Sequence, residues 1–235
     1  MKIKALLIGA EGSGDSYLPG VKQDINSFKN YLMSEDGGAW KDNEISILNS
    51  PSKLLLSLSL INITAENNDF ILIYFAGHGS FSQLEGRKFY LNDKDYFTLN
   101  DVKNTCKKLL FIGDNCAKKE PLVISEKYED SVEDRQFDNM RVMAREKYLK
   151  WLGSCDNQKI YLFGCKEDEY SGETDEGGHF TQALINESKK THKDLSVLEA
   201  FTLAKIKVQN RTEYEQNPTY TMNTRPLKVL PFKIS

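Results

Sequence analysis

Short runs of consecutive apolar residues alternate along the chain with segments whose apolar residues recur every three or four positions. Runs that are apolar throughout are typical of strands buried in a parallel sheet, and the longer period is typical of helices with one buried face. The pattern predicts strands at 3–9, 44–48, 69–76, 108–113, 159–164 and 227–230, with a hairpin arm at 88–91. It predicts helices at 21–32, 54–63, 100–107, 179–187 and 196–210. Ser50 followed by Pro51 predicts the start of the second helix.

This alternation predicts an α/β protein, a three-layer α/β/α sandwich with a mostly parallel central sheet. The chain has 235 residues, which suffices for one large domain or two small ones. The composition shifts only at about 118–150, a stretch rich in both acidic and basic residues between two predicted core strands. We interpret that stretch as an exposed, linker-like insertion. We therefore expect a single domain over 1–235.

Charge and composition argue against several classes of protein. The 31 Lys and Arg residues are balanced by 34 Asp and Glu, which argues against a nucleic-acid partner. No stretch approaches the roughly 20 apolar residues of a membrane helix, and the first apolar run is too short for a signal peptide. The 4 cysteines and 3 histidines show no zinc-ligand spacing. We expect a cytoplasmic protein with free thiols, and no membrane, nucleic acid or bound metal.

Two reactive side chains follow strands that are predicted to share one edge of the sheet. His78 stands between two glycines after the strand at 69–76, and Cys116 comes soon after the strand at 108–113. Ligands bind beyond the carboxyl ends of the strands in open parallel sheets, and paired strands lie about 4.8 Å apart. If these strands pair, the imidazole and the thiol lie within reach of each other. Either residue alone is more often structural, and their combination favours a function.

A cysteine beside a histidine predicts nucleophilic catalysis. The thiolate attacks a carbonyl carbon, while the imidazole takes the thiol proton and returns one to the leaving amine. The backbone N–H groups of Gly79 and Cys116 could hold the oxyanion. The glycine-rich turn at 9–14 leaves a small-molecule-binding domain open as an alternative. That turn lacks the Lys-Ser/Thr ending of a phosphate loop, and Glu11 within it would repel phosphate.

These motifs resemble those of the caspase-like cysteine peptidases, the clan of caspases, paracaspases and metacaspases in peptidase family C14. The resemblance rests on Gly77-His78-Gly79, Asp114-x-Cys116, Gly178-His179-Phe180-Thr181 and Gln216-Asn217-Pro218. It runs discontinuously over about 3–218 and is closest in style to compact prokaryotic metacaspase-like members. It implies a caspase-like fold and a cysteine endopeptidase, with Cys116 as nucleophile, His78 as acid/base and Gly79 as oxyanion donor. The sequence departs from the family after the nucleophile, where Ala117 and Lys118 replace a pair of small residues.

The resemblance also implies a specificity. Asp114 matches the acid that metacaspase-like and paracaspase-like members place on the wall of the S1 pocket. Asp24 and Glu167 are further candidates for substrate binding in the same pocket. An acidic wall stabilises a cationic P1 side chain, so the resemblance implies cleavage after Arg or Lys. The structural alternative for Asp114 is a strand-end carboxylate that accepts backbone N–H bonds.

Regulation and biological setting are implied by the resemblance alone. No cofactor is required, although the acids at 167–176 could bind Ca²⁺ as in some metacaspases. The stretch at about 118–150 corresponds to the family's intersubunit linker, and Arg135, Arg141 and Arg145 are candidate self-cleavage sites. A solvated helix and loop is the alternative there. We expect a protein or peptide substrate, a regulatory partner protein and a role in prokaryotic defence or cell death. The competing hypothesis is a catalytically silent caspase-like scaffold that binds a partner.

Overall fold

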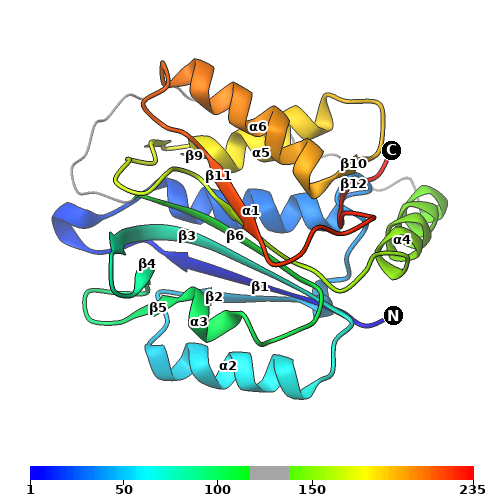
Figure 1. Cartoon of the computed structure of the whole chain (residues 1–235), viewed down its shortest axis with the longest axis horizontal. Helices are drawn as coiled ribbons and strands as arrows, with labels where there is room; N and C mark the ends of the chain where they lie inside the picture. Colours follow the sequence, from blue (N-terminus) through cyan, green and yellow to red (C-terminus); the bar gives the residue numbers. More distant parts are fainter. Residues whose placement is uncertain (117–137) are drawn as a thin grey trace.

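A computed structural model describes residues 1–116 and 138–235, and the backbone alone at Cys116 and Asp138. Its main strands lie side by side in the order β11–β7–β6–β3–β1–β2 (Figure 1). Their bounds are β1 Ile3–Ala10, β2 Ile45–Asn49, β3 Phe70–Ser82, β6 Leu109–Cys116, β7 Lys159–Phe163 and β11 Thr219–Met222. All of these pairings are parallel except that of β11 with β7. The predicted mostly parallel sheet is confirmed.

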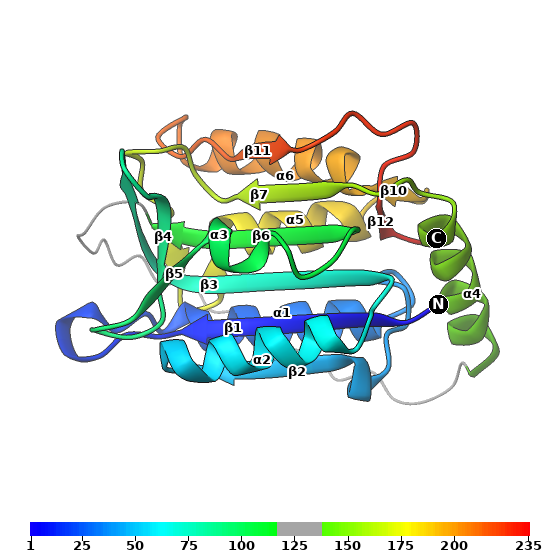
Figure 2. The same cartoon turned by 60° about the horizontal axis from the view of Figure 1, so that its bottom comes forward.

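Helices cover both faces of this sheet, as Figures 1 and 2 show. One face carries α1 (Gly20–Met33), α5 (His179–Lys189) and α6 (Val197–Arg211), and the other carries α2 (Lys53–Ala65) and the short α3 (Leu99–Val102). Each face of the sheet has its own hydrophobic core, and successive residues of a strand point to opposite faces. In β1, Ala5 and Leu7 pack in the core under α1, whereas Leu6 and Ile8 pack in the core under α2. The three-layer sandwich predicted from the alternation of strands and helices is therefore confirmed.

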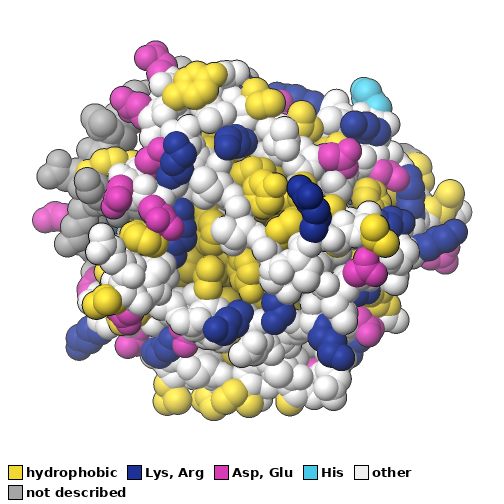
Figure 3. Space-filling model, viewed as in Figure 1, with side chains coloured by type: hydrophobic (Ala, Val, Ile, Leu, Met, Phe, Trp, Pro, Cys, Tyr) yellow, Lys and Arg dark blue, Asp and Glu magenta, His cyan; other side chains and the backbone are white. Residues whose placement is uncertain are grey.

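The helix α2 starts at a different cap from the predicted one, and it is hydrophobic on its outer face as well as its inner face. Ser52 caps it, because its Oγ accepts the Leu55 N–H at 3.2 Å, and the predicted cap Ser50 instead has a positive φ of 42°. The inner face buries Leu56, Leu60 and Ile63. Hydrophobic side chains also gather on the outside of this helix (Figure 3), namely Leu54, Leu55, Leu58 and Ile61.

The ends of several strands also differ from the sequence prediction. β3 continues past Gly77 and pairs antiparallel with β4 (Gly86–Tyr90), which pairs with β5 (Tyr96–Thr98). The prediction of an edge strand at 227–230 is wrong. The edge of the sheet beside β7 is formed by β11 instead. Small elements complete the described fold: η1 Gly14–Ser16, η2 Asp42–Glu44, the pair β8 Glu173–Thr174 and β9 Gly177–Gly178, and the pair β10 Leu195–Ser196 and β12 Pro231–Lys233.

The predicted insertion at about 118–150 lies partly in a helix. Residues 117–137, including the candidate cleavage site Arg135, lie outside the described residues, and α4 (Asp138–Gly153) follows. Tyr148 of α4 packs on Trp40, with ring centroids 6.0 Å apart. Arg145 forms an ion pair with Glu44, and its side chain is only 13% exposed. Cleavage after Arg145 would therefore require α4 to unwind.

Arg141 lies on the same helix and donates a hydrogen bond to the Met33 carbonyl at 3.1 Å. Cleavage at that position would likewise have to disrupt a docked helix. None of the helices in the described part of the chain is long and apolar enough to cross a membrane.

Candidate active site

The pairing of β3 with β6 brings the backbones of His78 and Cys116 together. The two strands run parallel, and their register pairs Ala76 with Asp114 and, at the end of the ladder, His78 with Cys116. Adjacent strands of a sheet lie about 4.8 Å apart. Because both strands are apolar before this point, the register is set by the core and delivers these polar residues to the same edge.

A backbone carbonyl orients the His78 ring. The Nε2 atom of His78 lies 2.5 Å from the carbonyl oxygen of Ser16, which follows β1 in the short helix η1. A carbonyl oxygen can only accept a hydrogen bond, so Nε2 carries the proton and Nδ1 is left as the basic nitrogen. The role of Ser16 could not be predicted from the sequence, because every residue type offers a backbone oxygen.

The glycine-rich turn at 9–14 holds this carbonyl in place. Gly12 has a φ of 71°, which favours glycine, and a Cβ there would overlap the Ser16 oxygen and approach His78 Nε2 to 3.2 Å. The Leu18 N–H donates to the Glu11 carbonyl at 2.7 Å and closes the turn. The turn that left a small-molecule site open in the sequence analysis thus packs around the histidine.

Asp114 lies two residues before Cys116 and is only 5% exposed. Its carboxylate accepts hydrogen bonds from Ser171 Oγ at 2.8 Å and from the N–H and Oγ1 of Thr181 at 2.9 and 2.7 Å. Burial raises the pKa of Asp114, and these three hydrogen bonds oppose the rise. Gln216 in turn donates to Ser171 Oγ at 2.9 Å. Thr181 and Gln216, quoted above as family motifs, therefore hold the aspartate.

A second buried carboxylate comes from α1. Asp24 is 2% exposed and accepts the Gly178 N–H at 2.9 and 3.0 Å through its two oxygens. Burial raises the pKa of Asp24 well above its usual range, and the charge of Asp114 raises it further. A Cβ on Gly178 would overlap Asp114 and lie 3.2 Å from Asp24 Oδ2. Both carboxylates thus approach the same glycine at the start of α5.

These carboxylates line a small pocket together with Glu173. Its volume is about 20 Å³. Its lining residues are Leu18, Val21, Asp24, Gly77, Asp114, Asn115, Ser171, Gly172, Glu173 and Gly178. Burial, followed by the charges of Asp114 and Asp175, raises the pKa of Glu173 to about 7. Glu167, the third acid expected here, is exposed and does not line this pocket. The structure therefore corrects the acid set by placing Glu173 where Glu167 was expected.

The remaining candidates lie around this site or serve the core. Gly79 follows His78 on β3, and a Cβ there would overlap Asn115 Nδ2, so a side chain is excluded. His179 begins α5, and burial lowers its pKa to about 4. Cys165 is fully buried, and burial raises its thiol pKa to about 11, so this thiol is part of the core. The side chains that the structure describes form no group of three or more metal-ligating residues.

The sequence of the chain matches a known protein family. The family model of the caspase domain, peptidase family C14, matches residues 2–230. The chain belongs to the caspase family. This confirms the predicted resemblance to caspase-like cysteine peptidases, a family of hydrolases that act on proteins. The closer resemblance of this chain to metacaspase-like members stays a prediction.

A solved structure shows the same fold at low sequence identity. Caspase-1 from Spodoptera frugiperda is 13% identical to this caspase-family chain, with a TM-score of 0.62. The match covers 98% of this chain and 89% of the insect protein's chain. A search of curated proteins finds no match. The structural likeness therefore confirms the caspase-like fold.

Proposed function

We propose that this caspase-family domain is a cysteine endopeptidase that cleaves proteins after Arg or Lys through a Cys116–His78 dyad. The observation that carries the proposal is the acidic pocket beside the paired ends of β3 and β6. Asp24, Asp114 and Glu173 line it, and no lysine or arginine in the described part of the chain does so. A pocket of this charge favours a cationic P1 side chain over an acidic one.

The dyad supplies the chemistry. With Nε2–H held by the Ser16 carbonyl, His78 Nδ1 takes the proton of the Cys116 thiol, and the thiolate attacks the scissile carbonyl carbon. The Gly79 N–H stabilises the oxyanion of the tetrahedral intermediate. His78 then returns the proton to the leaving amine, which leaves a thioester. His78 deprotonates a water molecule for hydrolysis of this thioester, which releases the acid and regenerates the thiol.

The pocket carries the specificity. The pKa of Asp24 is raised because it is buried beside Asp114. An incoming guanidinium or ammonium group opposes this rise and ionises the carboxyls. A cavity of about 20 Å³ holds little more than one water molecule. Substrate binding must therefore widen the pocket, and the segment at 171–174, which forms one wall with Ser171 and Glu173, is the wall we expect to move.

A peptide panel tests the proposal. Fluorogenic peptides that differ only at P1, carrying Arg, Lys or Asp, are incubated with the wild type and the Cys116→Ala variant. Cys106→Ala is the matched control, because Cys106 is half-buried in the loop before β6, far from His78 in the sheet. We expect release from the Arg and Lys peptides only, lost in Cys116→Ala and kept in Cys106→Ala. Release from the Asp peptide alone would overturn the pocket assignment. No release from any peptide, with or without Ca²⁺, would favour the silent scaffold.

A further inference from the structure

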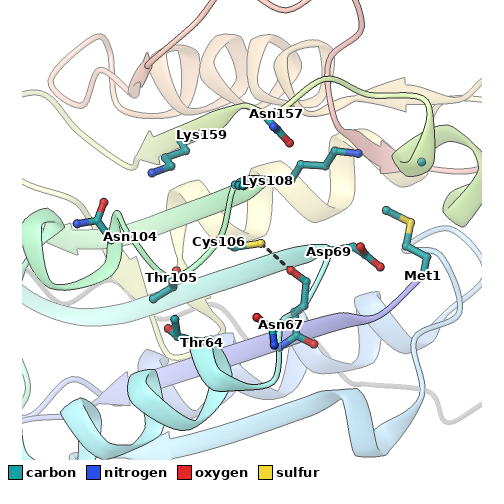
Figure 4. Close-up of a pocket in the computed structure, with 13 residues that line it drawn as sticks. Met1, Thr64, Asn67, Asp69, Asn104, Thr105, Cys106, Lys108, Asn157 and Lys159 are labelled. Carbon is teal, nitrogen blue, oxygen red and sulfur yellow. Dashed lines mark hydrogen bonds between the residues drawn. The ribbon is translucent and has the colours of Figure 1, made fainter.

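A second hollow lies at the opposite end of the sheet from the candidate active site (Figure 4). Its volume is about 690 Å³, within the range of roughly 300–1,000 Å³ that small-molecule sites occupy. It is lined by residues near the starts of β1, β3, β6 and β7 and by the end of α2. These are Met1, Thr64, Asn67, Asn68, Asp69, Asn104, Thr105, Cys106, Lys107, Lys108, Gly153, Asn157 and Lys159.

The lining is positively charged. Lys107, Lys108 and Lys159 contribute three cations, and among the described lining residues only Asp69 contributes a carboxylate. Lys108 Nζ donates to the Leu152 carbonyl at 3.0 Å, and Lys159 Nζ donates to a backbone carbonyl as well. None of the three lysines forms an ion pair with a described residue. Their charges are therefore not neutralised by the protein, which favours an anionic ligand.

The same hollow offers polar groups for the uncharged part of a ligand. The amide side chains of Asn67, Asn104 and Asn157 stand around it, with Cys106 between the walls (Figure 4). The Cys106 thiol donates to the Asn68 carbonyl at 3.0 Å. The Asn68 amide is held in the wall of the hollow, because its Nδ2 donates to the Ile63 carbonyl at 2.9 Å and to Glu66 Oε2 at 3.3 Å.

We propose that this hollow binds a small phosphorylated molecule. Its phosphate groups contact the lysine ammonium groups, and the rest of the molecule contacts the amide side chains of Asn67, Asn104 and Asn157. The site is distinct from the peptidase machinery and does not depend on it. β3 and β6 nevertheless begin beside this hollow, and their shared ladder ends at His78 and Cys116, so a bound ligand would stabilise the starts of the two strands that carry the dyad.

Isothermal titration calorimetry tests the proposal on the full chain carrying Cys116→Ala, which removes self-digestion. The probes are inorganic tripolyphosphate, ADP and adenosine. We expect tripolyphosphate and ADP to bind and adenosine to bind far more weakly. Tighter binding of ADP than of tripolyphosphate would identify a nucleotide as the source of the phosphate. Equal binding would identify the phosphate groups alone as the recognised feature.

Variants locate the binding. Lys107→Gln/Lys159→Gln should weaken tripolyphosphate binding by about tenfold or more, because each removes a charge-assisted contact. Lys193→Gln/Lys207→Gln changes the net charge equally on exposed residues outside the hollow and should leave binding unchanged. Asn68→Asp should weaken it through like-charge repulsion, and a melting curve for each variant reports its folding. Absence of binding to the parent chain, or an equal loss in both lysine pairs, would overturn the proposal.

Discussion

The two halves of the candidate active site are held in opposite ways. His78 is half-buried, and one hydrogen bond from its ring to a backbone carbonyl orients it. Asp114, two residues along the neighbouring strand from the partner of His78, is buried and fixed by three donors. Both side chains lie at the carboxyl end of the β3–β6 ladder, and both follow apolar, buried stretches of their strands.

The difference matches the two tasks. An acid/base must exchange protons with thiol, amine and water, so it needs access to solvent. A carboxylate that selects substrates does so because it attracts a cationic side chain and repels an anionic one. This energy difference is larger away from water, and the carboxylate must be held rigidly to discriminate between substrates. Burial of Asp24 and Asp114 therefore costs desolvation free energy in the empty pocket, and a cationic ligand offsets that cost.

The largest expected effect is a difference in stability between variants of the two buried aspartates. Asp114→Asn places an amide N–H among three donors and should destabilise the fold by about 2–4 kcal/mol. Asp24→Asn keeps an acceptor for Gly178 and removes a costly buried charge, so stability should be nearly unchanged. Both should lower kcat/KM for Arg peptides about a hundredfold. Urea unfolding and peptide hydrolysis measure the two effects, and equal destabilisation by both variants would contradict the contrast.

The next effect tests the hydrogen bond that orients the His78 ring. Gly12→Ala should lower kcat about ten- to a hundredfold, because its Cβ would displace the Ser16 carbonyl. Gly14→Ala is the matched control: Gly14 also has a positive φ, 55°, and a Cβ there meets nothing within 4 Å. Both substitutions place an alanine at a positive φ, so any additional fall in the melting temperature of Gly12→Ala reports the contact of its Cβ with the Ser16 carbonyl. Equal activity in the two variants would show that the carbonyl does not position the ring.

The smallest effect concerns Glu173, the least buried acid of the pocket. Its pKa of about 7 makes it neutral below that pH and ionised above it. KM for an Arg peptide should therefore fall about three- to tenfold as pH rises from about 6 to 8, and Glu173→Gln should remove that dependence.

Stability provides a second readout with the opposite sign. The pKa of Glu173 in the fold lies above its ordinary value of 4.5, so its contribution to stability is complete below 4.5. That contribution is lost as pH rises toward 7. Relative to Glu173→Gln, the wild type should lose about 1–2 kcal/mol over this range after solvent screening is allowed for. A parallel pH profile for the two proteins would contradict the assignment.

Much of the fold follows from the sequence because buried parallel strands are apolar throughout. β1, β3 and β6 carry uninterrupted apolar runs, so their existence and the polar residues at their ends could be predicted. β11 could not be recognised in this way, because Thr219–Met222 is a half-exposed edge strand without an apolar run. Only Tyr148 and Leu152 of α4 are buried hydrophobic residues, so its helical period is weak in the sequence.

In the candidate site, too, residues placed by local sequence could be predicted, whereas residues placed by tertiary packing could not. His78 and Asp114 could be placed because they lie where predicted strands end. Glu173 could not be chosen over Glu167, because both acids lie in one irregular segment whose path depends on packing against Asp114 and α5. Ser16 acts through its backbone oxygen, which every residue type offers.

The central claim is that this fold couples His78 to Cys116, and the most direct measurement is the rate at which iodoacetamide alkylates Cys116 as a function of pH. Peptide-resolved mass spectrometry separates Cys116 from the buried Cys155 and Cys165. We expect rapid alkylation of Cys116 with a midpoint well below pH 8.5, and a midpoint that moves up toward pH 8.5 in His78→Ala. Superimposable pH profiles in the wild type and His78→Ala would show that the imidazole does not act on the thiol.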